Sequence, residues 1–90
     1  NGLYILDEPE AALSPQNQLA FMAKIYELTQ SGAQFIIATH SPIITALPNS
    51  KIYNFNKSIQ EIDYHDSESY QITKLTLENP ELILRNLLKK

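Results

Sequence analysis

Hydrophobic residues form two short continuous runs in the first half of the chain, at residues 3–6 and 35–38. Such runs, with no polar interruption, are typical of strands buried on both faces of a parallel sheet. Between them, apolar residues recur at helical spacing and widen into a surface that we expect to be well covered. These positions are Leu19, Phe21, Met22, Ala23, Ile25, Tyr26 and Leu28. The order strand, helix, strand predicts a right-handed parallel unit.

Turn and cap residues predict where the helices begin and end. Ser14-Pro15 supplies an N-cap followed by proline at the first helical position. Gly32 stands where a left-handed residue commonly ends a helix. Ser41-Pro42 repeats the N-terminal signal and predicts a short helix that ends before Pro48.

The pattern changes after residue 48, so we divide the chain into residues 1–48 and 49–90. Residues 51–55 and 59–64 predict an antiparallel hairpin that turns near residues 56–58. The polar, acidic stretch 63–69 predicts an exposed loop, and Asn79-Pro80-Glu81 predicts the start of a terminal helix. The expected fold is therefore α/β: a partial parallel sheet, then a hairpin and a terminal helix.

Composition narrows the class of protein. A hydrophobic content of 43% suits a packed core. A net charge of −3 is not the positive charge that is typical of nucleic-acid-binding domains. The absence of cysteine excludes disulfides and thiolate metal sites. No apolar run approaches the roughly 18 residues of a membrane span, so we expect a cytoplasmic protein. Because a buried strand begins at the first residues, we expect the chain to be part of a longer protein.

Polar side chains follow both buried runs. Asp7-Glu8 comes after the first run and Thr39-His40 after the second. Parallel strands end at one edge of a sheet, where ligands bind in open α/β folds, so these four residues are expected to lie together. Phosphoryl transfer needs a carboxylate for Mg²⁺ and a group that orients the attacking water. The alternatives are an acidic turn after the first strand and a histidine with a structural role.

Residues 6–15, Leu-Asp-Glu-Pro-Glu-Ala-Ala-Leu-Ser-Pro, followed by Ala-Thr-His-Ser-Pro-Ile at 38–43, resemble the Walker B, D-loop and H-loop series of ABC-class P-loop ATPases. The resemblance covers residues 3–47. It implies that Asp7 serves Mg²⁺, that Glu8 polarises the hydrolytic water, and that His40 contacts the γ-phosphate of ATP. The implied D-loop, which signals across a head-to-tail dimer, is Ala11, Ala12, Leu13 and Ser14. Transporter D-loops usually end in Asp, so Ser14 can equally be a helix cap alone.

Two details favour one branch of that family. Glu10 after Pro9, and Ser41-Pro42 after His40, resemble soluble ABC-class ATPases, including RecF-like and SMC-like proteins and stand-alone bacterial predicted ATPases. The resemblance implies ATP binding, Mg²⁺-dependent hydrolysis and a homodimer. Nucleic acid would bind only through parts outside this chain. The sequence contains no Gly-x-x-x-x-Gly-Lys-Ser/Thr phosphate-binding loop, so we expect the 90-residue chain alone to be inactive.

The sequence allows three other interpretations. The first is the nucleotide-binding domain of an ABC transporter, and the second is an interaction domain that kept the fold and lost the chemistry. The third is a metal site in the acidic stretch, but the spacing of its residues matches no familiar ligand pattern and favours a solvated loop. Those residues are Asp63, His65, Asp66 and Glu68.

Overall fold

A computed structural model describes residues 2–55 and 58–89, and the chain divides into two compact units, Asn1–Ser50 and Lys51–Lys90. The first unit contains, in order, β1 (Gly2–Asp7), the 3₁₀ helix η1 (Pro9–Ala12), α1 (Pro15–Gln30), β2 (Ala33–Ala38) and the 3₁₀ helix η2 (Ile44–Ala46). The second contains β3 (Ile52–Asn54), β4 (Gln60–Ile62), the 3₁₀ helix η3 (Tyr64–Asp66), α2 (Glu68–Glu78) and α3 (Pro80–Leu88).

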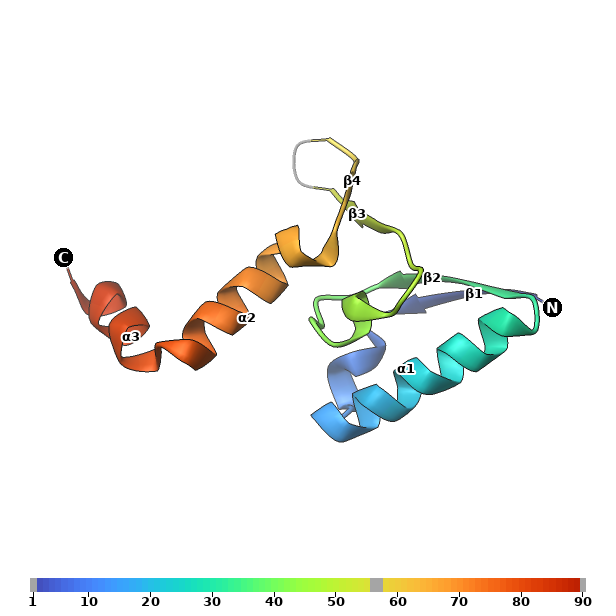
Figure 1. The fold of residues 1–90 in the computed structure, drawn as a ribbon, viewed down its shortest axis with the longest axis horizontal. Helices are drawn as coiled ribbons and strands as arrows, with labels where there is room; N and C mark the ends of the chain where they lie inside the picture. The colour runs from blue at the N-terminus through green and yellow to red at the C-terminus, as the bar shows by residue number, and fades with distance from the viewer. Residues whose placement is uncertain (1, 56–57, 90) are drawn as a thin grey trace. The chain divides into compact units, whose positions relative to one another are not determined.

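The sheet of the first unit consists of β1 and β2, which pair in parallel (Figure 1). The register runs from Gly2 opposite Ala33 to Asp7 opposite Ala38. Helix α1 makes the connection and packs against β2. The predicted strand–helix–strand unit is therefore confirmed, and both strands end at the same level.

The core of this unit lies on one face of the sheet. Ile25 of α1, Ala33 of β2 and Ile44 of η2 are buried. On the strands, the rings of Tyr4 and Phe35 stack with centroids 5.1 Å apart. Burial of apolar area, together with this aromatic contact, holds the two strands and the helix together.

The other face of the sheet is apolar and exposed, with exposed fractions of 57% for Leu3, 73% for Ile5 and 59% for Ile36. The prediction that both strands are buried on both faces is wrong for this chain, because alternate strand residues point to opposite faces and α1 lies on one side. The expectation that α1 is well covered is also wrong. Leu19 and Tyr26 are exposed, and Ile25 is the residue of α1 that is buried.

The predicted caps of α1 are confirmed. The side chain of Ser14 accepts a hydrogen bond from the amide of Asn17 over 3.2 Å, and Pro15 follows it. Gly32 has φ 101°, a left-handed conformation that glycine adopts without steric cost. The helix predicted after Ser41-Pro42 is only the short turn η2, which ends before Pro48 as expected.

In the second unit, β3 and β4 pair antiparallel, which confirms the hairpin. The predicted turn near 56–58 falls partly on residues 56–57, outside the described part of the chain. The terminal helix α3 begins at Pro80, as the Asn79-Pro80 signal predicted.

The prediction of a loop at 63–69 is wrong, although Asp63, His65, Asp66 and Glu68 are exposed as expected. The segment forms η3 and the first turn of α2. The reason is the buried residue Ser67, whose hydroxyl donates to the carbonyl of Tyr64 over 2.8 Å and accepts from the amide of Tyr70 over 3.1 Å. It is therefore both the end of η3 and the N-cap of α2. Within the ranges 2–55 and 58–89, no helix has the length and apolar content needed to cross a bilayer.

Candidate functional site

The ends of the two parallel strands bring the predicted acidic and histidine segments together. Asp7 lies opposite Ala38, the residue before Thr39-His40. One position further on, the amide of Glu8 donates to the carbonyl of Ala38 over 2.7 Å. Asp7, Glu8 and His40 are all exposed, so a ligand at this edge can reach their side chains.

The backbone of Glu8 turns sharply after the strand. Its φ and ψ are 48° and 55°, a left-handed conformation that is uncommon for residues other than glycine. Backbone strain of this kind costs on the order of 1–3 kcal/mol and is found most often at functional sites. Here it redirects the chain from β1 into η1.

Asp7 is the candidate ligand for a metal ion at this edge. Magnesium is usually held by one or two carboxylates, several waters and substrate phosphates, rather than by a cage of protein ligands. The exposed carboxylate of Asp7 fits that requirement. No group of three or more histidine, aspartate or glutamate side chains within residues 2–55 and 58–89 is arranged to hold a metal.

A third carboxylate at the edge, that of Glu10, bridges the two strand ends. Its Oε1 accepts a hydrogen bond from the Thr39 hydroxyl over 2.6 Å, and its Oε2 accepts one from the His40 amide over 3.0 Å. Burial opposes ionisation of Glu10, but these two hydrogen bonds, a bond from its own backbone amide and the nearby charge of His40 together hold its pKa below the ordinary value of 4.5. Sequence reasoning used Glu10 as a family marker and missed this contact.

A second contact joins residues 39–43, the histidine loop between β2 and η2, to α1. The hydroxyl of the buried residue Ser41 donates to the side-chain oxygen of Gln18 and accepts from the amides of Ile43 and Ile44. The amide group of Gln18 in turn donates to the carbonyl of Leu13 over 3.3 Å. No signal in the sequence singles out Gln18, which reads as one polar position of a helix.

The residues of the predicted D-loop form the connection from η1 to α1. Ala11 and Ala12 are exposed in the 3₁₀ turn, and Leu13 is extended and half-buried. Ser14 caps α1 through its hydroxyl, which is the alternative role that the sequence predicts for it. This segment directly follows the turn that carries Glu8 and Glu10.

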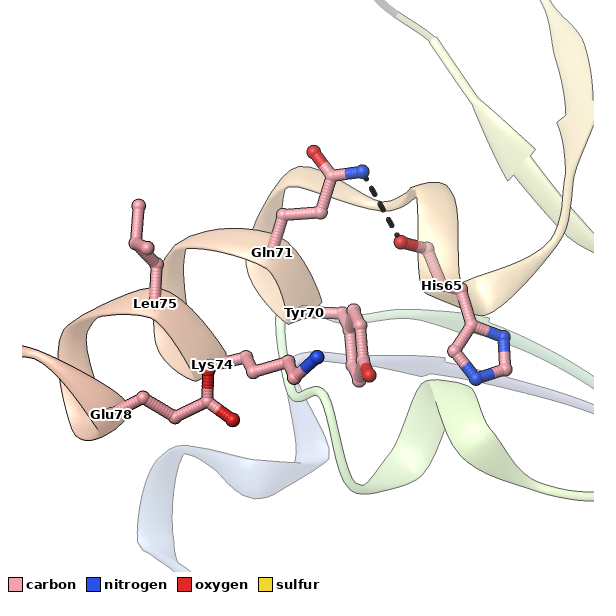
Figure 2. A pocket seen from close by; sticks show the side chains of 6 residues that line it. All are labelled: His65, Tyr70, Gln71, Lys74, Leu75 and Glu78. Atoms are coloured by element: carbon pink, nitrogen blue, oxygen red, sulfur yellow. Dashed lines mark hydrogen bonds between the residues drawn. The ribbon is translucent and has the colours of Figure 1, made fainter.

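The second unit has a hollow of about 350 Å³ beside α2 (Figure 2). Its lining residues are His65, Tyr70, Gln71, Lys74, Leu75 and Glu78. The Gln71 side chain donates to the carbonyl of His65 over 3.3 Å, and the His65 ring pairs with Asp63 and stacks on Tyr64. None of the predicted site residues lines this hollow.

Comparison with known proteins indicates an ATPase-type domain. A family model described as AAA ATPase domain matches residues 1–45. The chain is also 30% identical over 82 residues to the energy-coupling factor transporter ATP-binding protein EcfA of Methanococcus maripaludis. That alignment covers 83% of this chain and 29% of the relative. No solved structure shows significant similarity to the chain.

The matched segment contains β1, η1, α1, β2 and the loop that carries His40. It spans residues 1–45 of the 90, which is half of the sequence. The remaining half holds the hairpin and the last two helices and lies outside the family match. Because the family model matches half of the sequence, the chain belongs to the AAA ATPase domain family.

Proposed function

We propose that this chain supplies the acidic and histidine edge of an ATPase that binds ATP and hydrolyses it with Mg²⁺. The observation that carries the proposal is the pairing of Asp7 with Ala38, reinforced by the Glu8 amide bond to the Ala38 carbonyl over 2.7 Å. This pairing puts two carboxylates beside Thr39-His40. Membership of an ATPase family supports the same activity. The full reaction belongs to the full-length protein, because this chain lacks a phosphate-binding loop.

Each residue has a role that its position suits. Asp7 holds the magnesium ion, which neutralises charge on the phosphates when bound. The Glu8 carboxylate polarises the attacking water and accepts its proton. His40 donates a hydrogen bond to an oxygen of the γ-phosphate. In this proposal, the D-loop residues Ala11 to Ser14 face a second subunit of a homodimer.

The finer assignment is to soluble ABC-class ATPases of the RecF-like and SMC-like kind, on the strength of Glu10 and Ser41-Pro42. The alternative is a transporter-coupled ATPase, which the name of the Methanococcus relative favours. Purification in detergent distinguishes them. A transporter component should co-purify with a membrane-embedded protein, whereas a soluble ATPase should be recovered without one.

The test of the activity uses the full-length protein that contains this chain. Wild type, Glu8→Gln and the control Glu27→Gln are assayed for phosphate release and for binding of Mg-ATP. Glu27 is an exposed residue of α1 whose side chain is 72% accessible. We expect Glu8→Gln to lower kcat by about 10²- to 10⁴-fold while ATP binding is kept, because the amide cannot accept the proton.

Two outcomes would count against the proposal. Absence of ATP hydrolysis in the wild type would favour the alternative of an interaction domain without catalysis. Equal turnover by wild type and Glu8→Gln would remove Glu8 from the role of base. The Glu27→Gln control is expected to match wild type in both assays.

A further inference from the structure

The carboxylate of Glu10 makes the side-chain contacts that join the two halves of the candidate site. It lies on η1, two residues beyond Glu8, and it contacts residues 29 and 30 positions away in the sequence. One oxygen binds the Thr39 hydroxyl and the other binds the His40 backbone amide. The two bonds therefore restrain both the position and the direction of the chain at His40.

The restraint extends beyond the two direct bonds. The Thr39 hydroxyl that donates to Glu10 also accepts from the Ser41 amide over 3.0 Å. Thr39 and His40 thus bind the Glu10 carboxylate directly, and Ser41 is connected to it through the Thr39 hydroxyl. An ionised acceptor forms stronger hydrogen bonds than a neutral one, and Glu10, whose pKa lies below the ordinary value of 4.5, is ionised at neutral pH.

We propose that Glu10 is a positioning residue, whose carboxylate holds the Thr39–His40 backbone against the turn that carries Glu8. It leaves the chemistry to Glu8 and His40 and sets the distance between them. Only this catalytic consequence rests on the proposed function. The restraint itself is a property of the contacts. Small displacements of a reacting group slow turnover strongly, so a looser loop should lower kcat more than it weakens ATP binding.

Glu10 and Thr39, the two partners of the hydrogen bond, are substituted one at a time to test the contact from each side. Glu10→Gln keeps the size of the side chain, but it replaces one of the two accepting oxygens with an NH₂ group, which donates and cannot accept. Thr39→Val removes the hydroxyl and keeps the shape, whereas Thr39→Ser keeps the hydroxyl. Glu27→Gln, on the exposed surface of α1, is the matched control for the loss of a negative charge.

The first measurement is hydrogen–deuterium exchange of the full-length protein without nucleotide, followed by mass spectrometry. We expect exchange in the peptide that covers residues 39–41 to become at least about tenfold faster in Glu10→Gln and Thr39→Val. Exchange in Thr39→Ser and Glu27→Gln should match wild type. Unchanged exchange in both Glu10→Gln and Thr39→Val would overturn the proposal, whether or not the protein hydrolyses ATP.

The second measurement is steady-state ATP hydrolysis. We expect kcat to fall by about 10- to 100-fold in Glu10→Gln and Thr39→Val, with KM changed less than about twofold, and to recover in Thr39→Ser. Faster exchange with an unchanged kcat would make the contact structural only and would refute the positioning role. If the wild type has no activity, the proposed function fails, and the exchange data still decide whether Glu10 restrains the loop.

Discussion

The hydroxyl of Ser41 donates a hydrogen bond to the side-chain oxygen of Gln18, and so joins the histidine loop to α1. The same hydroxyl accepts from the amides of Ile43 and Ile44 over 3.2 and 3.1 Å. One buried side chain thus satisfies three polar groups. Leaving such groups without partners is more costly than the mean value of a hydrogen bond suggests.

Ser41→Ala should therefore destabilise the folded protein by about 1–3 kcal/mol, because it leaves the loop amides and Gln18 without their partner. Urea denaturation of wild type and variant measures the difference. Ser50→Ala is the control, since Ser50 is exposed and its hydroxyl donates locally, to the Leu47 carbonyl. Equal losses for the two variants would contradict this account of Ser41.

The contribution of Glu10 to stability should depend on pH. Its pKa in the folded protein lies below the ordinary value of 4.5, because burial raises it less than the hydrogen bonds, those from Thr39 and His40 first, and the charge of His40 together lower it. A depressed pKa adds stability that is fully present above pH 4.5 and is lost as the pH falls through the lower folded value.

We therefore expect wild type to melt above Glu10→Gln at pH 7, and the difference to shrink below pH 4.5. Asp63 also has a lowered pKa, caused first by the hydrogen bond from the His65 side chain. Because Asp63 is present in both proteins, the difference between them isolates Glu10. A difference in melting temperature that stays constant from pH 7 to pH 3 would contradict the prediction.

Ser67→Ala should shorten or loosen α2 at its start. The substitution removes the N-cap bond to the Tyr70 amide and the bond to the Tyr64 carbonyl. Loss of a serine cap costs about 0.5–2 kcal/mol. Thermal unfolding followed by circular dichroism measures this loss, and Ser67→Asp should keep much of the stability because aspartate is also a good cap. An alanine variant as stable as wild type would rule out a capping role for Ser67.

The 90-residue chain on its own should neither bind ATP tightly nor hydrolyse it. Backbone amides and a lysine of a phosphate-binding loop usually make most of the phosphate contacts, and this sequence has no such motif. Calorimetry with Mg-ATP and a phosphate-release assay test the purified chain. Micromolar affinity, or turnover above background, would mean that the nucleotide is held by residues other than those expected.

The exposed apolar face of the two-stranded sheet should make the isolated chain self-associate. Leu3, Ile5 and Ile36 lie on that face, and unpaired strand edges add to the tendency. Sedimentation at tens of micromolar should detect dimers or larger species, and Ile5→Lys should reduce them. Leu77→Lys, at an equally exposed position of α2, is the control. A molecular mass that stays that of a monomer at all concentrations would contradict the prediction that this surface drives self-association.

The elements with strong local signals were predictable from the sequence. Ser14-Pro15 and Gly32 set the limits of α1, because caps depend on contacts within a few residues. The two apolar runs predicted a parallel pair, and the topology of that pair alone brought Asp7-Glu8 and His40 to one edge. That inference needed no side-chain geometry, since parallel strands connected by a helix end on the same side.

Helix α2 was missed for a physical reason. Its sequence contains Ile72, Thr73 and Thr76, β-branched residues with modest helix propensity, and its apolar residues do not form a clear stripe. The Ser67 cap, which accepts from Tyr70, supports the start of the helix, but Ser67 stands in a polar stretch that reads as a loop.

Only the tertiary structure decided which polar groups meet across the chain. The bonds from Thr39 and His40 to Glu10 join residues about 30 positions apart, and Ser41 reaches Gln18 over 23 positions. No local pattern records such contacts, because they depend on where β1, α1 and β2 place their ends in space. The same holds for the bare face of the sheet. The apolar residues of β1 and β2 predict burial, but whether Ile5 is covered depends on which elements lie against it.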